Sequence, residues 1–312
     1  MGKRGFLNYV WNGPYSVSFE VTYACNARCK HCHLGGPVTE ERATPKRLGQ
    51  VSEAIHSVEV ILSGGEPLLR HDLEDIARAI RRKNGPPYIV CTTNAGLLNK
   101  KRYQSLREAG VDQFSISLDY PDERHDEYRG IPGLFQKIRD LISGLDSSAN
   151  KPITLSCCVQ RDNFRDMLKF ARLAADWKVR VNFSTYTWLR TKNKEYLLTK
   201  EDLPELREIV NQLLELKKRN KNFYASSYTF QRMIRYFEDG YIPGCRAGQR
   251  FFVVNPNGAV SPCGLIMKYY KDVAQMRAEF VPTNTCGYCN TTVRSECEKP
   301  VQLLVRDNLE SM

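Results

Sequence analysis

The sequence lacks long hydrophobic runs, and none of its apolar stretches approaches the ~20 residues that a helix needs to cross a bilayer. The first residues, Met1–Asn12, carry Lys3 and Arg4 but no apolar core of the kind found in secretion signals. The sequence therefore predicts no membrane association and no secretion. Eleven cysteines without an export signal favour metal ligation over a disulfide framework, so we expect a reducing compartment, the cytoplasm.

The sequence also lacks the pattern of a nucleic-acid-binding surface, although its charge is strongly positive. There are 46 Lys and Arg against 35 Asp and Glu, which gives a net charge of +11. These cations are scattered over helical segments such as Arg78–Lys83 and Lys217–Arg219, without interleaved aromatic residues. Solvated helix faces explain most of them, so we expect no nucleic-acid partner. A negatively charged substrate or an acidic electron donor is compatible with the excess of positive charge.

Strand-like and helix-like segments alternate over the first 190 residues, and 312 residues are enough for one large α/β core. Amphipathic segments repeat apolar residues with the helical period, as Leu73, Ile76 and Ile80 do. Six β-then-α units imply parallel strands, in an open doubly wound sheet or a partial barrel. The strands are predicted at Val17–Thr22, Val58–Ser63, Tyr88–Thr92, Gln113–Leu118, Ile153–Val159 and Val179–Thr185.

The pattern changes twice along the chain and predicts three parts. Residues 1–190 hold the alternating units, and residues 191–242 form a helical connection around Leu206–Leu214 and Phe230–Phe237. Residues 243–312 are rich in Gly, Pro and Cys, with a hairpin turn predicted at Asn255–Gly258. We expect a small domain organised by metal there.

Three cysteines follow the first predicted strand: Cys25, Cys29 and Cys32, with the spacing C-x3-C-x2-C. These offsets also fit one helix face, so a buried cysteine stripe is one interpretation and a zinc site is another. The polar residues among them, such as Asn26 and Arg28, oppose the buried stripe. A [4Fe–4S] cluster needs a thiolate on each iron to be fully ligated, so three thiolates leave one iron open to a small molecule. We favour this cluster.

The segment Cys25–Cys32 resembles the signature of the radical S-adenosylmethionine (SAM) superfamily. The resemblance implies that SAM chelates the open iron through its amino and carboxylate groups. It also implies a fold of class α/β, a partial (β/α)6 TIM-like barrel, with chemistry at the C-terminal ends of the strands. In such enzymes the reduced cluster cleaves SAM, and the resulting 5′-deoxyadenosyl radical removes hydrogen from a C–H bond of the substrate.

The resemblance extends to the strand ends that follow. The run Ser63–Pro67 matches the motif that hydrogen-bonds the SAM amino group, although alone it is only a tight turn. In the run Thr92–Gly96, Ala95 replaces the glycine that is usual in the family. The residues that the resemblance assigns to SAM are Gly64, Gly65, Glu66, Pro67, Thr93 and Ser117. Gln160, Asn163 and His31 are candidates to surround the adenine. Polar capping of the barrel is the alternative for Thr93 and Ser117, and a solvated histidine is the alternative for His31.

Cysteines recur near the end of the chain in two separated pairs, which can enclose a structural zinc ion. The spacing C-x12-G-x4-C around Gly258 resembles the start of the SPASM or twitch extension of radical SAM enzymes. Because the chain has fewer cysteines than the full SPASM pattern, the resemblance implies a twitch-like domain with one auxiliary [4Fe–4S] cluster. Its ligands are Cys245, Cys263, Cys286 and Cys289, while Cys297 is an alternative ligand or a free thiol. Cys91, Cys157 and Cys158 lie in strands and are predicted core residues.

An auxiliary cluster with four thiolates has no open iron, so the resemblance assigns it to electron transfer, as acceptor of an electron from a substrate radical. Such an oxidation also needs a base, and each candidate has a structural role as its alternative. The candidates near strand ends are Glu20, Asp119, Tyr120 and Tyr186, and Arg190 can bind an anionic group. In a redox-neutral epimerisation, Cys297 is a candidate hydrogen donor.

The resemblance thus predicts a radical SAM enzyme, of oxidoreductase type, that takes electrons from a low-potential flavodoxin or ferredoxin. No N-terminal peptide-recognition domain is seen, and ligands for only one auxiliary cluster are present, so a small substrate is favoured. A sugar, cyclitol or nucleotide derivative is expected, by analogy with aminocyclitol dehydrogenases and the first cyclase of molybdenum-cofactor synthesis. The alternatives are a maturase that oxidises, crosslinks or epimerises a ribosomal peptide, and a zinc-stabilised binding protein.

Overall fold

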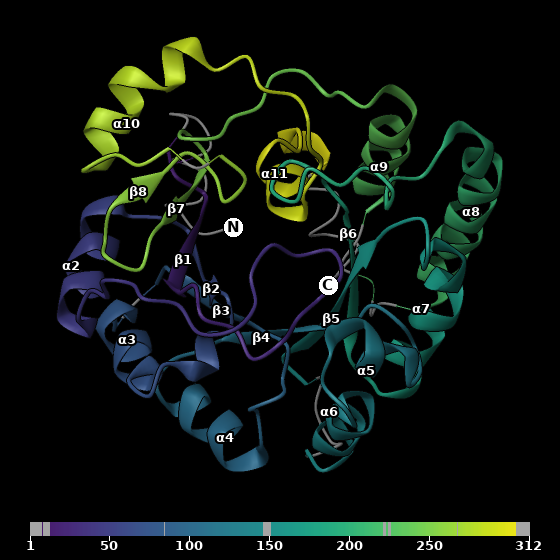
Figure 1. Cartoon of the computed structure of the whole chain (residues 1–312), viewed down its shortest axis with the longest axis horizontal. Helices are drawn as coiled ribbons and strands as arrows, with labels where there is room; N and C mark the ends of the chain where they lie inside the picture. The colour runs from purple at the N-terminus through teal and green to yellow at the C-terminus, as the bar shows by residue number, and fades with distance from the viewer. Residues whose placement is uncertain are drawn as a thin grey trace.

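Six parallel strands form an unclosed barrel with helices around its outside (Figure 1). The computed structural model describes Asn8 and residues 13–83, 85–145, 151–220, 223, 226–266 and 268–303. The strands are β1 (Ser16–Thr22), β2 (Glu59–Gly64), β3 (Tyr88–Thr93), β4 (Gln113–Ser117), β5 (Ile153–Val159) and β6 (Arg180–Thr185). Each lies within two residues of a strand predicted from the sequence.

The helices connect successive strands and then continue beyond β6. Those of the barrel are α2 (Pro45–Ile55), α3 (Leu73–Ile80), α4 (Lys100–Glu108), α5 (Arg124–Arg129), α6 (Leu134–Ser143) and α7 (Met167–Asp176). Those that follow are α8 (Leu203–Arg219), α9 (Ser227–Asp239), α10 (Val273–Glu279) and α11 (Thr292–Cys297). Short 3-10 helices are η1 (Pro67–Leu69), η2 (Phe164–Asp166), η3 (Lys200–Asp202) and η4 (Val281–Thr283). Among the described residues, no helix is long and apolar enough to cross a membrane.

The sheet contains eight strands in the order β6-β5-β4-β3-β2-β1-β7-β8. The pairs from β1 to β6 are all parallel. The sheet does not close between β6 and β8, so the prediction of a partial α/β barrel is confirmed. In such a fold the C-terminal ends of the parallel strands gather at one mouth.

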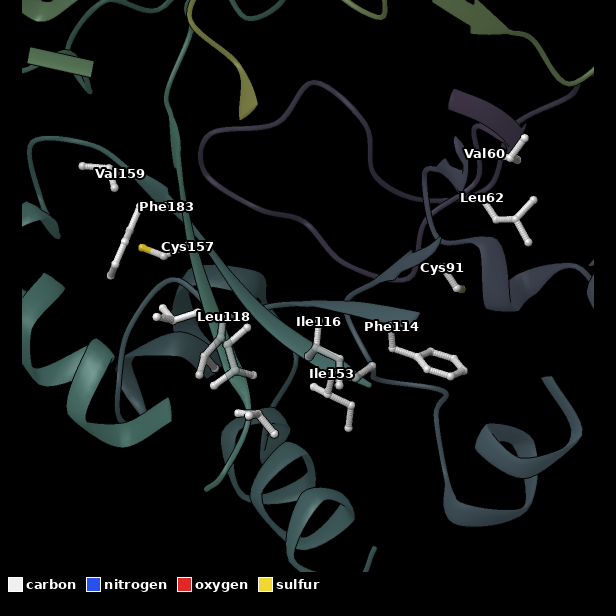
Figure 2. Close-up of a cluster of buried hydrophobic side chains, with 14 of the residues drawn as sticks. Val60, Leu62, Cys91, Phe114, Ile116, Leu118, Ile153, Cys157, Val159 and Phe183 are labelled. Carbon is white, nitrogen blue, oxygen red and sulfur yellow. The ribbon is translucent and has the colours of Figure 1, made fainter. Parts of the chain in front are cut away.

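Alternation along the strands separates a hydrophobic outer face from a polar inner face. Outward side chains of β2 to β6 form one buried layer beneath the helices, as Figure 2 shows for Leu62, Phe114 and Phe183. Cys91 and Cys157 belong to this core as predicted, but Cys158 does not, because it is partly exposed on the inner face of β5. The inner face carries partly exposed hydroxyl groups: Ser18, Ser63, Thr92, Ser115, Ser117, Ser156 and Ser184.

The C-terminal segment lies on the open side of the barrel. Strand β7 (Phe251–Val254) pairs in parallel with β1, and β8 (Val260–Ser261) pairs antiparallel with β7 across the predicted hairpin, where Gly258 has a φ of 90°. Helix α11 lies between β7 and β6 (Figure 1). Its first residue Thr292 accepts a hydrogen bond from Asn182 of β6 at 3.2 Å. The cysteine-rich segment therefore contacts both edge strands of the six-stranded array.

Candidate functional site

The first cysteine triad lies on a loop at the C-terminal end of β1. The amide of Cys25 donates to the Gly36 carbonyl at 3.1 Å, and the amide of Gly36 donates back at 2.8 Å, which closes the loop. The loop contains no helix, so the interpretation as a helical stripe of buried cysteines is wrong. Backbone amides of Ala27 and Leu34 lie 3.4 Å from the sulfurs of Cys25 and Cys32. Burial raises the pKa of the Cys25 thiol, and the hydrogen bond from the Ala27 amide opposes that rise.

Two glycines let this loop approach the end of β2. A Cβ atom on Gly64 would lie 2.1 Å from the Thr22 carbonyl oxygen, and one on Gly65 would lie 2.1 Å from the Ala24 carbonyl oxygen. The amide of Gly65 donates to the Thr22 carbonyl at 2.7 Å. Gly64 also has a φ of 128°, which side chains disfavour. The double glycine therefore sets the distance between the cysteine loop and the strand end.

Glu66 connects this turn to the end of β3. Its buried carboxylate accepts hydrogen bonds from the Thr93 hydroxyl at 2.6 Å, the Asn94 amide at 2.8 Å and the Leu68 amide at 3.1 Å. Burial raises the pKa of Glu66, and these hydrogen bonds oppose the rise. The side chains of Glu66 and Thr93, both predicted SAM contacts, thus hydrogen-bond each other. They hold the turn in shape and leave its backbone to face a ligand.

Asn94 is a site residue that the sequence analysis did not single out. Its side-chain nitrogen donates to the Asn26 side chain of the cysteine loop at 2.8 Å, and its oxygen accepts from the Gly96 amide at 2.8 Å. The neighbouring Ala95 has a φ of 62°, the left-handed conformation that favours glycine. The position that departs from the family pattern therefore keeps the backbone shape that glycine would give.

One pocket collects these groups at the mouth of the barrel. All three cysteines of the loop line it together with residues from the ends of β2, β3 and β4. Predicted residues on its wall are Cys25, Cys29, Cys32, His31, Gly64, Gly65, Glu66, Thr93 and Ser117. Three predicted residues lie elsewhere: Pro67 begins η1, Gln160 donates to the Tyr128 hydroxyl, and Asn163 donates to the Asp119 and Cys158 carbonyls.

Arg129, the last residue of α5, brings a buried positive charge to the pocket wall. Its guanidinium forms an ion pair with Asp119, at 2.8 Å from Nε and 2.5 Å from Nη2 to Oδ2. Burial alone raises the pKa of Asp119, but the Arg129 charge and further partners outweigh burial and lower it. Burial raises the pKa of the Cys29 thiol to about 11, and Arg129 opposes that rise. The sequence analysis missed Arg129 because it lies within a helix and not at a strand end.

His31 presents a flat ring to the same pocket. It stacks nearly parallel to Tyr128, with ring centroids 5.3 Å apart, and its Nδ1 lies 2.7 Å from the Tyr128 hydroxyl. Burial lowers the pKa of His31 to about 4, so the imidazole is neutral at neutral pH. A neutral aromatic ring at this position can stack on a purine.

The second set of cysteines meets beside α11. Cys245 and Cys263 both lie within electrostatic range of Cys289, and Cys286 lies within range of Cys263 and Cys289. Burial raises the pKa of Cys245 and of Cys263 to about 12 each. The fully buried Arg294 places its Nη1 2.6 Å from the Cys289 carbonyl and 3.8 Å from the Cys289 sulfur. A cation beside Cys245 and Cys289 offsets negative charge that would gather there on metal binding.

The spacing of the thiols bears on the choice between zinc and a cluster. A zinc ion needs all its ligand atoms within about 2.3 Å of one centre. Among the described residues, no three His, Cys, Asp or Glu side chains are arranged to hold a metal ion. In a [4Fe–4S] cluster each thiolate binds its own iron, so the sulfurs stand farther apart. The described residues thus present no single-ion site, and a cluster stays the prediction for both cysteine sets.

The remaining candidates occupy different places. The Tyr186 hydroxyl is engaged by Thr191 at 2.8 Å and by the Asn193 carbonyl at 2.9 Å. Cys297 is buried close to Glu59 and Ser16, at the N-terminal ends of the strands, and does not line the pocket. Tyr120 is also buried, with the Arg124 guanidinium 4.9 Å above its ring. Glu20 faces the barrel interior beside Arg190, with 3.7 Å between Oε2 and Nη2.

Comparison with protein families gives a match to the Radical SAM superfamily over residues 19–199. An AdoMet-dependent heme synthase of Methanosarcina barkeri is 28% identical over 289 residues, 82% of this chain and 78% of that protein. A probable GTP 3′,8-cyclase of Pyrococcus horikoshii is 32% identical over 169 residues, half of this chain and 52% of that protein.

Among solved structures, Streptococcus suis SuiB bound to S-adenosylmethionine is similar in fold, with a TM-score of 0.66 and 16% identity. The match covers 87% of this chain and 65% of SuiB. SuiB bound to its precursor peptide SuiA matches 99% of this chain with a TM-score of 0.63 and 17% identity.

Proposed function

Since this chain belongs to the radical SAM superfamily, we propose that it reductively cleaves SAM and abstracts a hydrogen atom from a small molecule. The substrate is a sugar, a cyclitol or a nucleotide derivative, and the reaction is a dehydrogenation. One observation carries the proposal: three loop thiols share a pocket with the Gly64–Gly65 turn and Ser117. Family membership favours the cluster over a zinc-stabilised binding protein for the loop cysteines Cys25, Cys29 and Cys32, which lie within the matched residues.

Different residues of the pocket would hold the cluster and SAM. Cys25, Cys29 and Cys32 would hold three irons of a [4Fe–4S] cluster, which together with SAM supplies a 5′-deoxyadenosyl radical when reduced. The backbone of the Gly64–Gly65 turn would accept the SAM amino group. Arg129 and Ser117 line the pocket where a carboxylate would lie, and the neutral His31 ring would face the adenine.

The second cysteine set supports oxidation as the outcome. Cys245, Cys263, Cys286 and Cys289 would hold an auxiliary [4Fe–4S] cluster with all corners ligated, which suits electron transfer and not substrate binding. Arg294 would raise the reduction potential of such a cluster, because its positive charge would stabilise the added electron. The electron for SAM cleavage would come from a low-potential flavodoxin or ferredoxin.

The barrel interior supports a small polar substrate. The inner face of the strands carries hydroxyl groups and few large side chains, so it offers hydrogen bonds to a hydroxylated molecule. Peptide modification is the second candidate, because the fold of SuiB, solved with its precursor peptide, matches 99% of this chain.

The proposal is tested by anaerobic reconstitution with iron and sulfide, followed by SAM and dithionite. We expect 5′-deoxyadenosine and methionine from the wild type and none from Cys29→Ala. Cys91→Ala, which removes a thiol from the outer core, is the matched control and should retain the activity. Full 5′-deoxyadenosine formation by Cys29→Ala would contradict the proposal. A short precursor peptide that accepts the radical, in place of small polyols, would support the second candidate.

A further inference from the structure

Glu20 is a buried carboxylate that the protein leaves incompletely hydrogen-bonded. It is 9% exposed on the inner face of β1. Within the described part of the chain its Oε2 accepts no hydrogen bond, although the Arg190 guanidinium lies 3.7 Å away. A buried carboxylate oxygen without a hydrogen bond is costly, so such a group is expected to have a partner in the working molecule.

The position of Glu20 relates it to both cysteine sites. In the β1–β2 ladder Glu20 pairs with Ser63, which lines the cysteine-loop pocket, so the two side chains share one face at neighbouring strands. On the other side, a Cβ atom on Gly264 would lie 3.0 Å from Glu20 Oε1. Gly264 follows Cys263 directly. Glu20 therefore lies between the SAM pocket and the auxiliary cysteines, where a substrate passing an electron from one to the other would be bound.

Two of the other candidates, Asp119 and Tyr186, are already engaged by hydrogen bonds. Asp119 forms an ion pair with Arg129, accepts a hydrogen bond from its Nε at 2.8 Å, and accepts another from the Cys158 amide at 3.1 Å. Tyr186 is bonded to Thr191 and to the Asn193 carbonyl. Burial raises the pKa of Glu20, while the Arg190 charge opposes the rise. Glu20 is thus a carboxylate whose basicity is increased by burial and whose ionised form is supported by a cation.

We propose that Glu20 binds a hydroxyl group of the substrate and accepts its proton during oxidation of that carbon, an inference that rests on the function proposed above. The 5′-deoxyadenosyl radical takes a hydrogen atom from the carbinol carbon and becomes 5′-deoxyadenosine. The hydroxyl proton moves to the Glu20 carboxylate, and one electron moves to an oxidised auxiliary [4Fe–4S] cluster. A C=O bond forms, so the substrate loses two protons and two electrons in total. The positive charge of Arg190 stabilises negative charge that develops on the substrate oxygen.

The test uses the full chain reconstituted with iron and sulfide, with SAM and dithionite. The probes are myo-inositol and glucose that carry deuterium on their ring carbons. We expect the wild type to transfer deuterium into 5′-deoxyadenosine and to form a ketone. Glu20→Gln keeps the shape of the side chain but is not a base. It should still transfer deuterium, while ketone formed per deuterated 5′-deoxyadenosine falls about 100-fold or more.

A second readout does not depend on turnover. Binding of myo-inositol to the SAM-loaded, unreduced protein is measured by calorimetry, and Glu20→Gln should weaken it about tenfold because a hydrogen bond to a charged acceptor is lost. The matched control is Glu59→Gln, a partly buried acid that accepts from Ser16 at the far end of β2, and both readouts should stay at wild-type values.

The outcomes separate the two proposals. Equal ketone yields from the wild type and Glu20→Gln, with deuterium transfer intact, would overturn the role of Glu20 and leave the proposed function standing. SAM cleavage without deuterium transfer from either probe, and without binding, would overturn the hydroxylated substrate together with the role of Glu20. An absence of SAM cleavage by the wild type would refute the proposed function itself.

Discussion

The ion pair between Asp119 and Arg129 offers a sharp test of how the pocket is held together. The Asp119 side chain is fully buried and the Arg129 side chain is 10% exposed, so neither charge is compensated by water when its partner is removed. Removing one partner of such a pair costs about 3–5 kcal/mol, mostly because the other charge stays buried. Asp119→Asn keeps the side-chain volume and removes only the charge, so we expect a loss of this size in the free energy of unfolding.

The assay is urea denaturation of the cluster-free protein, with the unfolding slope compared between variants to confirm two-state behaviour. The double variant Asp119→Leu with Arg129→Met should recover most of the loss, because it leaves no unpaired charge. The surface pair Arg207–Glu238, also at 2.8 Å but about half-exposed, is the control, and Glu238→Gln should cost at most about 1 kcal/mol. A loss in unfolding free energy below about 1 kcal/mol for Asp119→Asn would refute the argument that the buried pair stabilises the pocket. A double variant less stable than both single variants would refute it too.

Three further predictions concern the loop contacts and pH. Gly65→Ala places a Cβ 2.1 Å from the Ala24 carbonyl oxygen, so iron content at the first site should fall while circular dichroism stays unchanged; normal iron loading would contradict this. Ala95→Gly should leave the free energy of unfolding within about 1 kcal/mol of the wild type in thermal unfolding. Glycine relieves the backbone strain of alanine at a φ of 62°, and this offsets the larger entropy that glycine gives the unfolded chain. A loss of 2 kcal/mol or more would argue against this balance. Burial lowers the pKa of His125 to about 3. The unfolded chain therefore binds one more proton than the native state between pH 6.5 and 3, and stability falls there by about 1.4 kcal/mol per pH unit on acidification. His125→Gln should remove that slope in pH-dependent denaturation, the exposed His71→Gln should not, and equal slopes in all three proteins would count against it.

Much of the fold could be predicted because the hydrophobic period and the residue types of each segment indicate its secondary structure. The predicted strand Ile153–Val159 has the observed bounds, since a short segment with β-branched residues at both ends is flanked by helical patterns. The turn at Gly258 was placed by its Asn-Pro-Asn-Gly sequence. The pairing of β7 with β1 could not be predicted, because no local signal states which distant strand will cover an edge.

Site residues could be predicted from the sequence where a motif stands at the end of a strand. They could not be predicted where the side chain comes from a helix. The cysteine loop and the Gly64–Gly65 turn meet as expected. Arg129 was not predicted, because in the sequence it looks like any solvated charge at the end of an amphipathic helix. Only the structure shows that Asp119 lies beside it. Cys158 was assigned to the core because strand position alone does not fix which face a residue occupies. One position along a strand separates the helix-covered side from the interior.

The parallel pairing of β1 with β7 has a consequence for the order in which the protein can be assembled on the ribosome. More than two hundred residues separate Val17 from its partner Phe252. One edge of the very first strand thus stays bare throughout most of translation, offering unsatisfied backbone groups to any extended chain nearby. High contact order of this kind slows maturation, so nascent polypeptide stalled before β7 emerges should bind holding chaperones and aggregate when they are scarce.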